Sequence, residues 1–229
     1  MKKIHRFLTT ENLSDHNNSI KDKDLVHIIK NVLKFDVGEI CIFFFDGSED
    51  YLSEITEIKK DSVSFRTISK IPKKNIPKNI TACISITKRD TFEIVVQKLT
   101  EIGVNKIIPI LSGRTVKQAL KIDRLQKISE EALEQSGGSN VVNILDPISL
   151  EECLNQTKDM SCIYFDIEGE KYQKQDLKEL AFYIGPEGGW NDEDKALFSK
   201  YNVKSYKLGE TVLRAETASI VCGYKLLWD

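Results

Sequence analysis

Residues 181–194 read AFYIGPEGGWNDED: a short apolar run, a loop rich in glycine and a cluster of acids. The apolar run predicts a strand over Ala181–Ile184, and Asn191 followed by three acidic residues predicts the N-cap and first turn of a helix. Glycine allows close approach of backbone to a ligand, and ligands bind beyond the carboxyl ends of strands in open α/β sheets. The spacing matches neither a dinucleotide fingerprint nor a P-loop. We therefore expect a ligand-binding loop of another kind, with an ordinary strand-to-helix turn as the alternative.

Strands and helices alternate on both sides of this loop. Apolar residues at helical spacing predict a helix from Phe92 to Ile102, and other helices are expected at about 123–136, after Ser149, after Asn191 and over about 217–228. This alternation predicts an α/β domain with a mostly parallel sheet and helices on both faces. The last helix is almost uncharged and is expected to be buried in a core or an interface. The expected strands are Thr81–Ile86, Lys106–Leu111, Val141–Leu145, Cys162–Asp166, Ala181–Ile184 and Lys204–Leu208.

The first 70 residues follow a different rhythm. Strand-like runs at Glu39–Asp46, Tyr51–Ile58 and Val63–Ile68 follow one helical pattern between residues 25 and 33. Short strands on tight turns with one helix predict a small β-barrel. Residues 71–79 hold two prolines among several lysines and predict an extended linker. The chain is thus expected to divide into domains 1–70 and 80–229.

Composition limits the class of protein. The 229 residues include 33 basic and 35 acidic side chains, and the net charge of −2 argues against a strongly basic nucleic-acid-binding module. Any RNA contact must therefore come from local clusters. The longest apolar run, Ile40–Phe45, is far shorter than the roughly 20 residues of a membrane span. Five scattered cysteines and three histidines form no metal or disulfide pattern, so we expect reduced thiols, no metal and a cytoplasmic protein.

A second motif places charges beside apolar sequence. Residues 208–218 read LGETVLRAETA, between the last expected strand and the last helix. Arg214 and Glu216 in this motif need a partner or a function if they are buried. The alternative is a surface ion pair, with Thr217 capping the helix.

Basic residues form a third cluster. Arg114, Lys117 and other basic residues lie between 114 and 127, and Lys88 and Arg89 end the first strand of the second domain. These residues are either a patch that contacts phosphate or a solvated helix face.

Five segments in order resemble the RsmE family, the 16S ribosomal RNA (uracil-N3)-methyltransferases of the SPOUT superfamily. The segments are residues 97–104, 112–114, 134–137, 184–189 and 208–218. Residues 4–7 and 32–47 resemble the PUA-like, RNA-binding barrel of that family. The resemblance covers nearly the whole chain, and it implies a homodimer that binds S-adenosyl-L-methionine and 16S rRNA and has a C-terminal trefoil knot. The periodicity alone predicts an unknotted, doubly wound sheet.

The resemblance also implies roles for individual residues, with no metal among the ligands. The catalytic residues would be Arg214 and Glu216. The RNA-binding residues would be Arg6, Lys34, Lys88, Arg89, Arg114 and Lys117. The cofactor-binding residues would be Phe165, Ile184, Gly185, Pro186, Gly188, Gly189, Leu208, Val212, Leu213, Thr217 and Ala218.

The implied reaction removes the uridine N3 proton and stabilises the resulting negative charge. Arg214 or Arg114 could supply the cation, and Glu216 or Glu187 could act as the base or orient an arginine. The sequence departs from the family at Gly138, Thr211 and Lys34, where two positive charges are lost and a third is altered, while the cofactor motifs are intact. Two alternatives stay open: a SPOUT 2′-O-ribose RNA methyltransferase, and a non-enzymatic RNA-binding factor in ribosome assembly.

Overall fold

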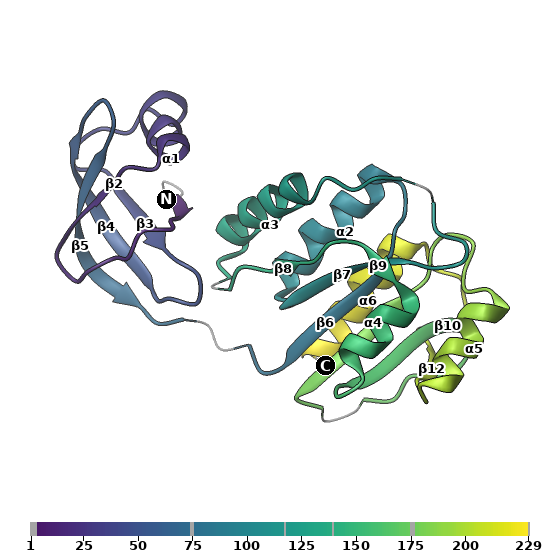
Figure 1. Cartoon of the computed structure of the whole chain (residues 1–229). Coiled ribbons are helices and arrows are strands. Elements are labelled where there is room, and N and C mark those ends of the chain that lie inside the picture. Colours follow the sequence, from purple (N-terminus) through teal and green to yellow (C-terminus); the bar gives the residue numbers. More distant parts are fainter. Residues whose placement is uncertain (1–3, 74–75, 117, 139, 175–176, 229) are drawn as a thin grey trace. The chain divides into compact units, whose positions relative to one another are not determined.

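The computed structural model describes residues 4–73, 76–116, 118–138, 140–174 and 177–228 (Figure 1). The chain divides into two units. One comprises residues 1–75 together with 133–141, and the other comprises 76–132 together with 142–229. The break after residue 75 lies inside the expected linker, although strand β5 continues to Ile71. The sequence did not predict that residues 133–141 belong with the N-terminal part.

A parallel sheet forms the centre of the second unit. Its strand order is β12-β10-β11-β6-β7-β8, β9 also pairs with β7, and all the described pairings are parallel. The six strands expected from the sequence are present, whereas β9 was not expected and β10 runs five residues further than predicted. The strands are β6 (Asn79–Ser85), β7 (Lys106–Leu111), β8 (Asn143–Ile144), β9 (Ile148–Ser149), β10 (Ser161–Lys171), β11 (Glu179–Ile184) and β12 (Lys204–Lys207).

Helices cover both faces of this sheet, as the alternating pattern predicted (Figure 1). One apolar core joins the sheet to α2, α3 and α6, through residues such as Phe92 and Leu226. The second core joins the other face to α4 and α5, through Leu154 and Phe198. Capping boxes begin α4 and α5, at the two N-caps that the sequence indicated. The helices are α2 (Arg89–Ile102), α3 (Ile122–Ser136), α4 (Leu150–Thr157), α5 (Asp192–Lys200) and α6 (Ala215–Trp228).

Helix α6 differs in two ways from the helix expected at its position. It begins at Ala215, so Thr217 lies in its first turn and does not cap it. Cys222 faces the core, whereas Tyr224 and Trp228 are 54% and 50% exposed. Because the last two residues are one turn apart, they form an apolar stripe that the core of this chain leaves uncovered.

A mixed sheet forms the first unit, in the order β1-β3-β4-β5-β2. β1 is parallel to β3 and the other pairs are antiparallel. Its core contains Phe7, Phe43 and Phe65, and the last two rings stack 4.0 Å apart. The sequence predicted β3–β5 but missed β1 and β2, and its single helix is an α-helix followed by a π-helical turn. The elements are β1 (Arg6–Leu8), β2 (Asn17–Ile20), α1 (Lys23–His27), η1 (Ile28–Val32), β3 (Ile40–Phe44), β4 (Asp50–Ile58) and β5 (Val63–Ile71).

Arg6 connects residues 133–141 to the sheet of the first unit. Its guanidinium pairs with Asp50 at 2.7 Å and lies 3.5 Å from the centroid of the Phe44 ring. The same group donates to the carbonyl oxygens of Leu133 and Gly138. Only 7% of the Arg6 side chain is exposed, so this charge is satisfied inside the unit.

Asp50→Ala should destabilise the protein strongly, because it leaves the buried Arg6 guanidinium without its anion. We expect the free energy of unfolding, measured by urea denaturation, to fall by about 3 kcal/mol. Glu54→Ala is the matched control, since it removes the partner of Arg66, an exposed arginine of the same sheet. That control should cost less than about 1 kcal/mol. Equal losses would mean that the Arg6–Asp50 pair is no more important than a surface pair.

The buried thiol of Cys41 is expected to make the stability of the protein depend on pH in the alkaline range. Burial raises the pKa of Cys41 from 9.0 to about 12, with Glu39 adding to the effect. The folded state therefore keeps a proton that the unfolded state loses above pH 9, so this contribution to stability declines as pH rises from 9 towards 12. Urea denaturation across this range should show a shallower decline for Cys41→Ala than for the wild type. If the stabilities of the two proteins declined in parallel with pH, the raised pKa of Cys41 would not contribute to the pH dependence of stability.

Candidate functional site

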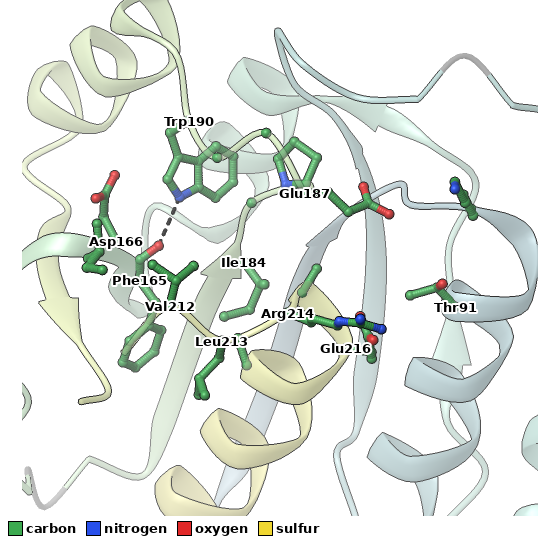
Figure 2. A pocket seen from close by; sticks show the side chains of 18 residues that line it. Thr91, Phe165, Asp166, Ile184, Glu187, Trp190, Val212, Leu213, Arg214 and Glu216 are labelled. Carbon is green, nitrogen blue, oxygen red and sulfur yellow. Dashed lines mark hydrogen bonds between the residues drawn. The ribbon is translucent and has the colours of Figure 1, made fainter. Parts of the chain in front are cut away.

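A cavity of about 760 Å³ opens in the second unit where strand ends and helix starts meet (Figure 2). The glycine-rich loop 184–190 forms one side, and residues 212–216, which lead into α6, form another. Residues 165–167 close a third side, where the pairing of β10 with β12 is interrupted. The start of α2 completes the rim with Lys88 and Thr91. Segments more than 120 residues apart in the chain thus meet at one site.

Trp190 forms a buried wall of this cavity. It is 5% exposed, and its indole N–H donates to the carbonyl oxygen of Phe165 at 3.0 Å (Figure 2). A Cβ atom at Gly185 would lie 3.2 Å from the indole ring, so glycine allows the loop to pass closely over it. Gly189 has a φ angle of +67°, which glycine adopts without strain. These contacts fix the path of the loop before any ligand binds.

A smaller hollow of about 110 Å³ adjoins the main cavity and shares some of its walls. Both are lined by residues 165–167 and by Val212 and Leu213, and the smaller one adds the segment that contains Leu208. Val212 is 78% exposed at this rim, an unusual exposure for an aliphatic side chain. An apolar group of a ligand would cover it.

Besides Asp166, four charged residues line the main cavity: Lys88, Glu187, Arg214 and Glu216. None of them forms an ion pair within 4.0 Å with any residue that the structure describes. The α2 and α6 N-termini lie at the same rim, and helix N-termini carry partial positive charge (Figure 2). The site can therefore stabilise an anion beside two carboxylates that are free to accept a proton or hydrogen bonds.

Asp166 supplies a further carboxylate to the cavity, and its charge is partly balanced. Lys195 of α5 lies 3.2 Å from Asp166 and 2.7 Å from Glu168. The hydrogen bond to Glu168 and the neighbouring Asp166 raise the pKa of Lys195, so the amine stays protonated. Asp166 is thus held in place at the edge of the cavity by Lys195 and by the amide of Glu168.

The structure brings most of the predicted cofactor residues together. Thr217 is the exception, because it is exposed on α6 and lines neither hollow, and Leu208 lines only the smaller one. The sequence did not predict Thr91, Ile167 or Trp190 as lining residues, whereas Ala215 lies inside the predicted segment 208–218. The predicted residues in the main cavity are Phe165, Ile184, Gly185, Pro186, Gly188, Gly189, Val212, Leu213 and Ala218, together with Lys88, Arg214 and Glu216.

The other predicted RNA-binding residues are distributed over both units. Arg114 donates from its guanidinium to the Gly188 carbonyl oxygen at 2.7 Å. Arg89 is exposed as the first residue of α2, and Lys34 is exposed in the first unit with a φ angle of +53°. Lys117 lies outside the described residues. The guanidinium of Arg6 is committed to the buried contacts of the first unit, which favours a structural role for it.

The described parts of the chain lack two kinds of feature. No group of three or more His, Cys, Asp or Glu side chains could hold a metal ion there. Among the same residues, no helix has both the length and the apolar character that crossing a membrane requires.

Comparisons with known proteins agree with one another. Residues 74–226 match the family model of an RNA methyltransferase domain. Ribosomal RNA small subunit methyltransferase E of Rickettsia conorii is 30% identical over 204 residues, covering 85% of this chain and 83% of the relative. The protein of that name from Mesomycoplasma hyopneumoniae is 30% identical over 236 residues, covering 99% and 100%.

A solved structure shows the same architecture. Ribosomal RNA small subunit methyltransferase E from Neisseria gonorrhoeae, bound to S-adenosyl methionine, has a TM-score of 0.88. The two chains are 27% identical, and the match covers 96% of this chain and 95% of the other. The α/β fold with its parallel sheet is therefore the fold of that protein.

Proposed function

The chain belongs to the RsmE family of RNA methyltransferase domains, and we propose that it transfers a methyl group from S-adenosylmethionine to N3 of a specific uridine in 16S ribosomal RNA. The observation that carries this proposal is the cavity between the glycine-rich loop and α6, with Arg214 and Glu216 at its rim. The relative from Neisseria gonorrhoeae, whose structure is bound to S-adenosyl methionine, supports the choice of cofactor.

S-adenosylmethionine suits both the size and the chemistry of this cavity. Its volume falls in the range of roughly 300–1,000 Å³ that is usual for small-molecule sites. Ile184, Leu213 and Trp190 offer apolar walls, and the close-packed glycine loop offers backbone amides and carbonyls to a heterocycle. When bound, this cofactor supplies a methyl group on a positively charged sulfur that is already activated for transfer. We assign its binding to Phe165, to residues 184–189 and to the segment from 208 to 218.

The protein must help uracil to lose its N3 proton. We assign Arg214 to the two carbonyl oxygens that flank N3, because a nearby cation favours the anionic form of the base. The N3 lone pair then attacks the methyl carbon, and the carbon–sulfur bond breaks. We assign Glu216 either to accept the proton or to hold Arg214 in place, with Glu187 as the other candidate acceptor. Since the methyl donor is already activated, positioning of the two reactants supplies much of the remaining rate.

RNA would bind around the rim of the cavity through a few local charges. These charges are Lys88, Arg89 and Arg114 of the second unit, and Lys34 would add a separate RNA contact on the first unit. Phosphate contacts of this kind position an RNA without reading its sequence. The net charge of −2 makes such binding dependent on these clusters and sensitive to salt.

Three further properties follow from family membership as proposals. The C-terminal domain would carry the trefoil knot of SPOUT proteins, and residues 1–70 would form the PUA-like RNA-binding barrel. The chain would act as a cytoplasmic homodimer. The exposed stripe of Tyr224 and Trp228 on α6 supports the dimer, because a second copy would cover it.

Nucleoside analysis of 16S rRNA from a strain that lacks this gene tests the proposed reaction. We expect 3-methyluridine to disappear in the deletion strain and to return with the wild-type gene. Primer extension should locate the base, since N3 methylation blocks Watson–Crick pairing. Loss of a 2′-O-methylated nucleoside would instead identify a ribose methyltransferase. An unchanged nucleoside profile, with no S-adenosylmethionine binding by calorimetry, would indicate a non-enzymatic assembly factor.

Arg214→Ala tests the proposed cation at the reacting base. We expect kcat to fall by about 10²–10³-fold, the usual cost of losing one group that stabilises developing charge. Affinity for S-adenosylmethionine should change by only a few-fold, and Arg214→Lys should recover part of the rate. Arg66→Ala, on the sheet of the first unit, is the matched arginine control. Unchanged turnover of Arg214→Ala would remove this residue from the mechanism.

A further inference from the structure

Asp194 is more deeply buried than its role as a helix cap requires. It is 4% exposed, the least exposed charged residue among those described, and it forms no ion pair with any of them. A buried carboxylate is costly unless hydrogen bonds compensate for the water that it loses. A capping box does not require a buried carboxylate. In the capping box of α4, Glu152 occupies the equivalent position, stays exposed and bonds to Ser149.

Backbone amides from two distant segments satisfy the Asp194 carboxylate. The amide of Asn191 donates to it at 3.1 Å, which completes the capping box of α5. The amide of Gly113, in the loop that follows β7, also donates to it, at 3.1 Å and 3.3 Å to the two oxygens. This second contact links residues 81 positions apart and has no counterpart at α4. Asp194 therefore fixes the loop as well as the helix.

The loop that Asp194 fixes is held tightly at its other contacts too. The Ser112 amide donates to the Thr115 hydroxyl at 2.7 Å, and the Ser112 and Ser85 hydroxyls are 3.0 Å apart. A Cβ atom on Gly113 would overlap the Asn191 amide group, so the loop lies directly against the start of α5. These contacts therefore fix the backbone position from which the side chain of the next residue extends.

That next residue, Arg114, lies across the glycine-rich loop of the cavity. Its guanidinium donates to the Gly188 carbonyl oxygen at 2.7 Å, and a Cβ atom on Gly188 would lie 3.3 Å from the Arg114 Cδ. A guanidinium has five N–H donors, so this contact leaves others for a ligand. Arg114 is the basic side chain held directly against this loop.

We propose that Asp194 is a positioning residue that holds Arg114 over the glycine-rich loop, ready to contact the RNA substrate. The inference rests on the proposed function, because it assigns Arg114 to the RNA. Its physical basis is preorganisation: a side chain that is already in place loses little freedom when the substrate binds. Asp194→Asn is the sharpest change, since the amide keeps the shape of the carboxylate but has one acceptor oxygen instead of two.

The test is a double-mutant cycle on steady-state methylation of small-subunit RNA. We expect Arg114→Ala and Asp194→Asn each to lower kcat/KM for RNA by about tenfold, with the double variant within twofold of Arg114→Ala. Affinity for S-adenosylmethionine, measured by calorimetry, should stay within threefold for all of them. Glu152→Gln alters the capping box of α4 and should leave kcat/KM within twofold of the wild type. A purely structural role of Asp194 would instead give losses that multiply to about a hundredfold.

Gly113→Ala keeps the proposal testable if Asp194→Asn does not fold. The added methyl group displaces the exposed loop from Asn191 without altering the carboxylate, so it should give the same tenfold loss and no further loss in combination with Arg114→Ala. Full activity of either Asp194→Asn or Gly113→Ala would overturn the proposal. A wild-type protein that methylates no RNA would refute the proposed function itself, whereas an active wild type with multiplying losses would refute only the positioning role.

Discussion

The hydrogen bond from the Trp190 indole to the Phe165 carbonyl ties the glycine-rich loop that follows β11 to the middle of β10, and the cavity is built around this junction. β10 and β11 are neighbours in the parallel sheet, and Phe165 is paired with Ile184, the last residue of β11, so this bond adds a second connection beside the last pair. An indole donor that is buried needs a partner, and the Phe165 carbonyl provides it. Trp190 also packs 4.8 Å from the Phe198 ring in the core on the α5 side. The glycine-rich loop is thus held by the same core that stabilises the sheet.

Local signals in the sequence predicted the elements well. Alternating strands and helices indicated the parallel sheet, and Asn191 marked the start of α5 because an N-cap needs only neighbouring residues. β1 and β2 were missed because three or four residues are too few for a periodic pattern. The role of Arg6 was also beyond reach, since its partner Asp50 is 44 residues away and nothing in the spacing connects the two.

The site was predictable in its segments but not in its assembly. The glycine-rich loop and residues 208–218 stood out as motifs, and both line the cavity. Thr91 lies at the start of α2, which follows β6, and it reaches the cavity because β6 is the neighbour of β11 in the sheet. It was missed because the order of strands in a sheet does not follow from periodicity. For the same reason, the sequence did not predict the hydrogen bond between Asp194 and Gly113. Its position as a cap was readable from the acids after Asn191, whereas its bond to Gly113 depends on how two loops meet in space.

The contacts of residues 133–141 have a consequence for how the first unit forms. Arg6 reaches Leu133 and Gly138 across 127 and 132 positions of sequence. Contacts at such separations form late and slow folding, because a long loop must close before they stabilise anything. During synthesis the strands of the N-terminal sheet are made early. The last two hydrogen-bond acceptors of the buried arginine are made only after more than half of the chain has been synthesised. The first unit is therefore completed only after much of the second has been made.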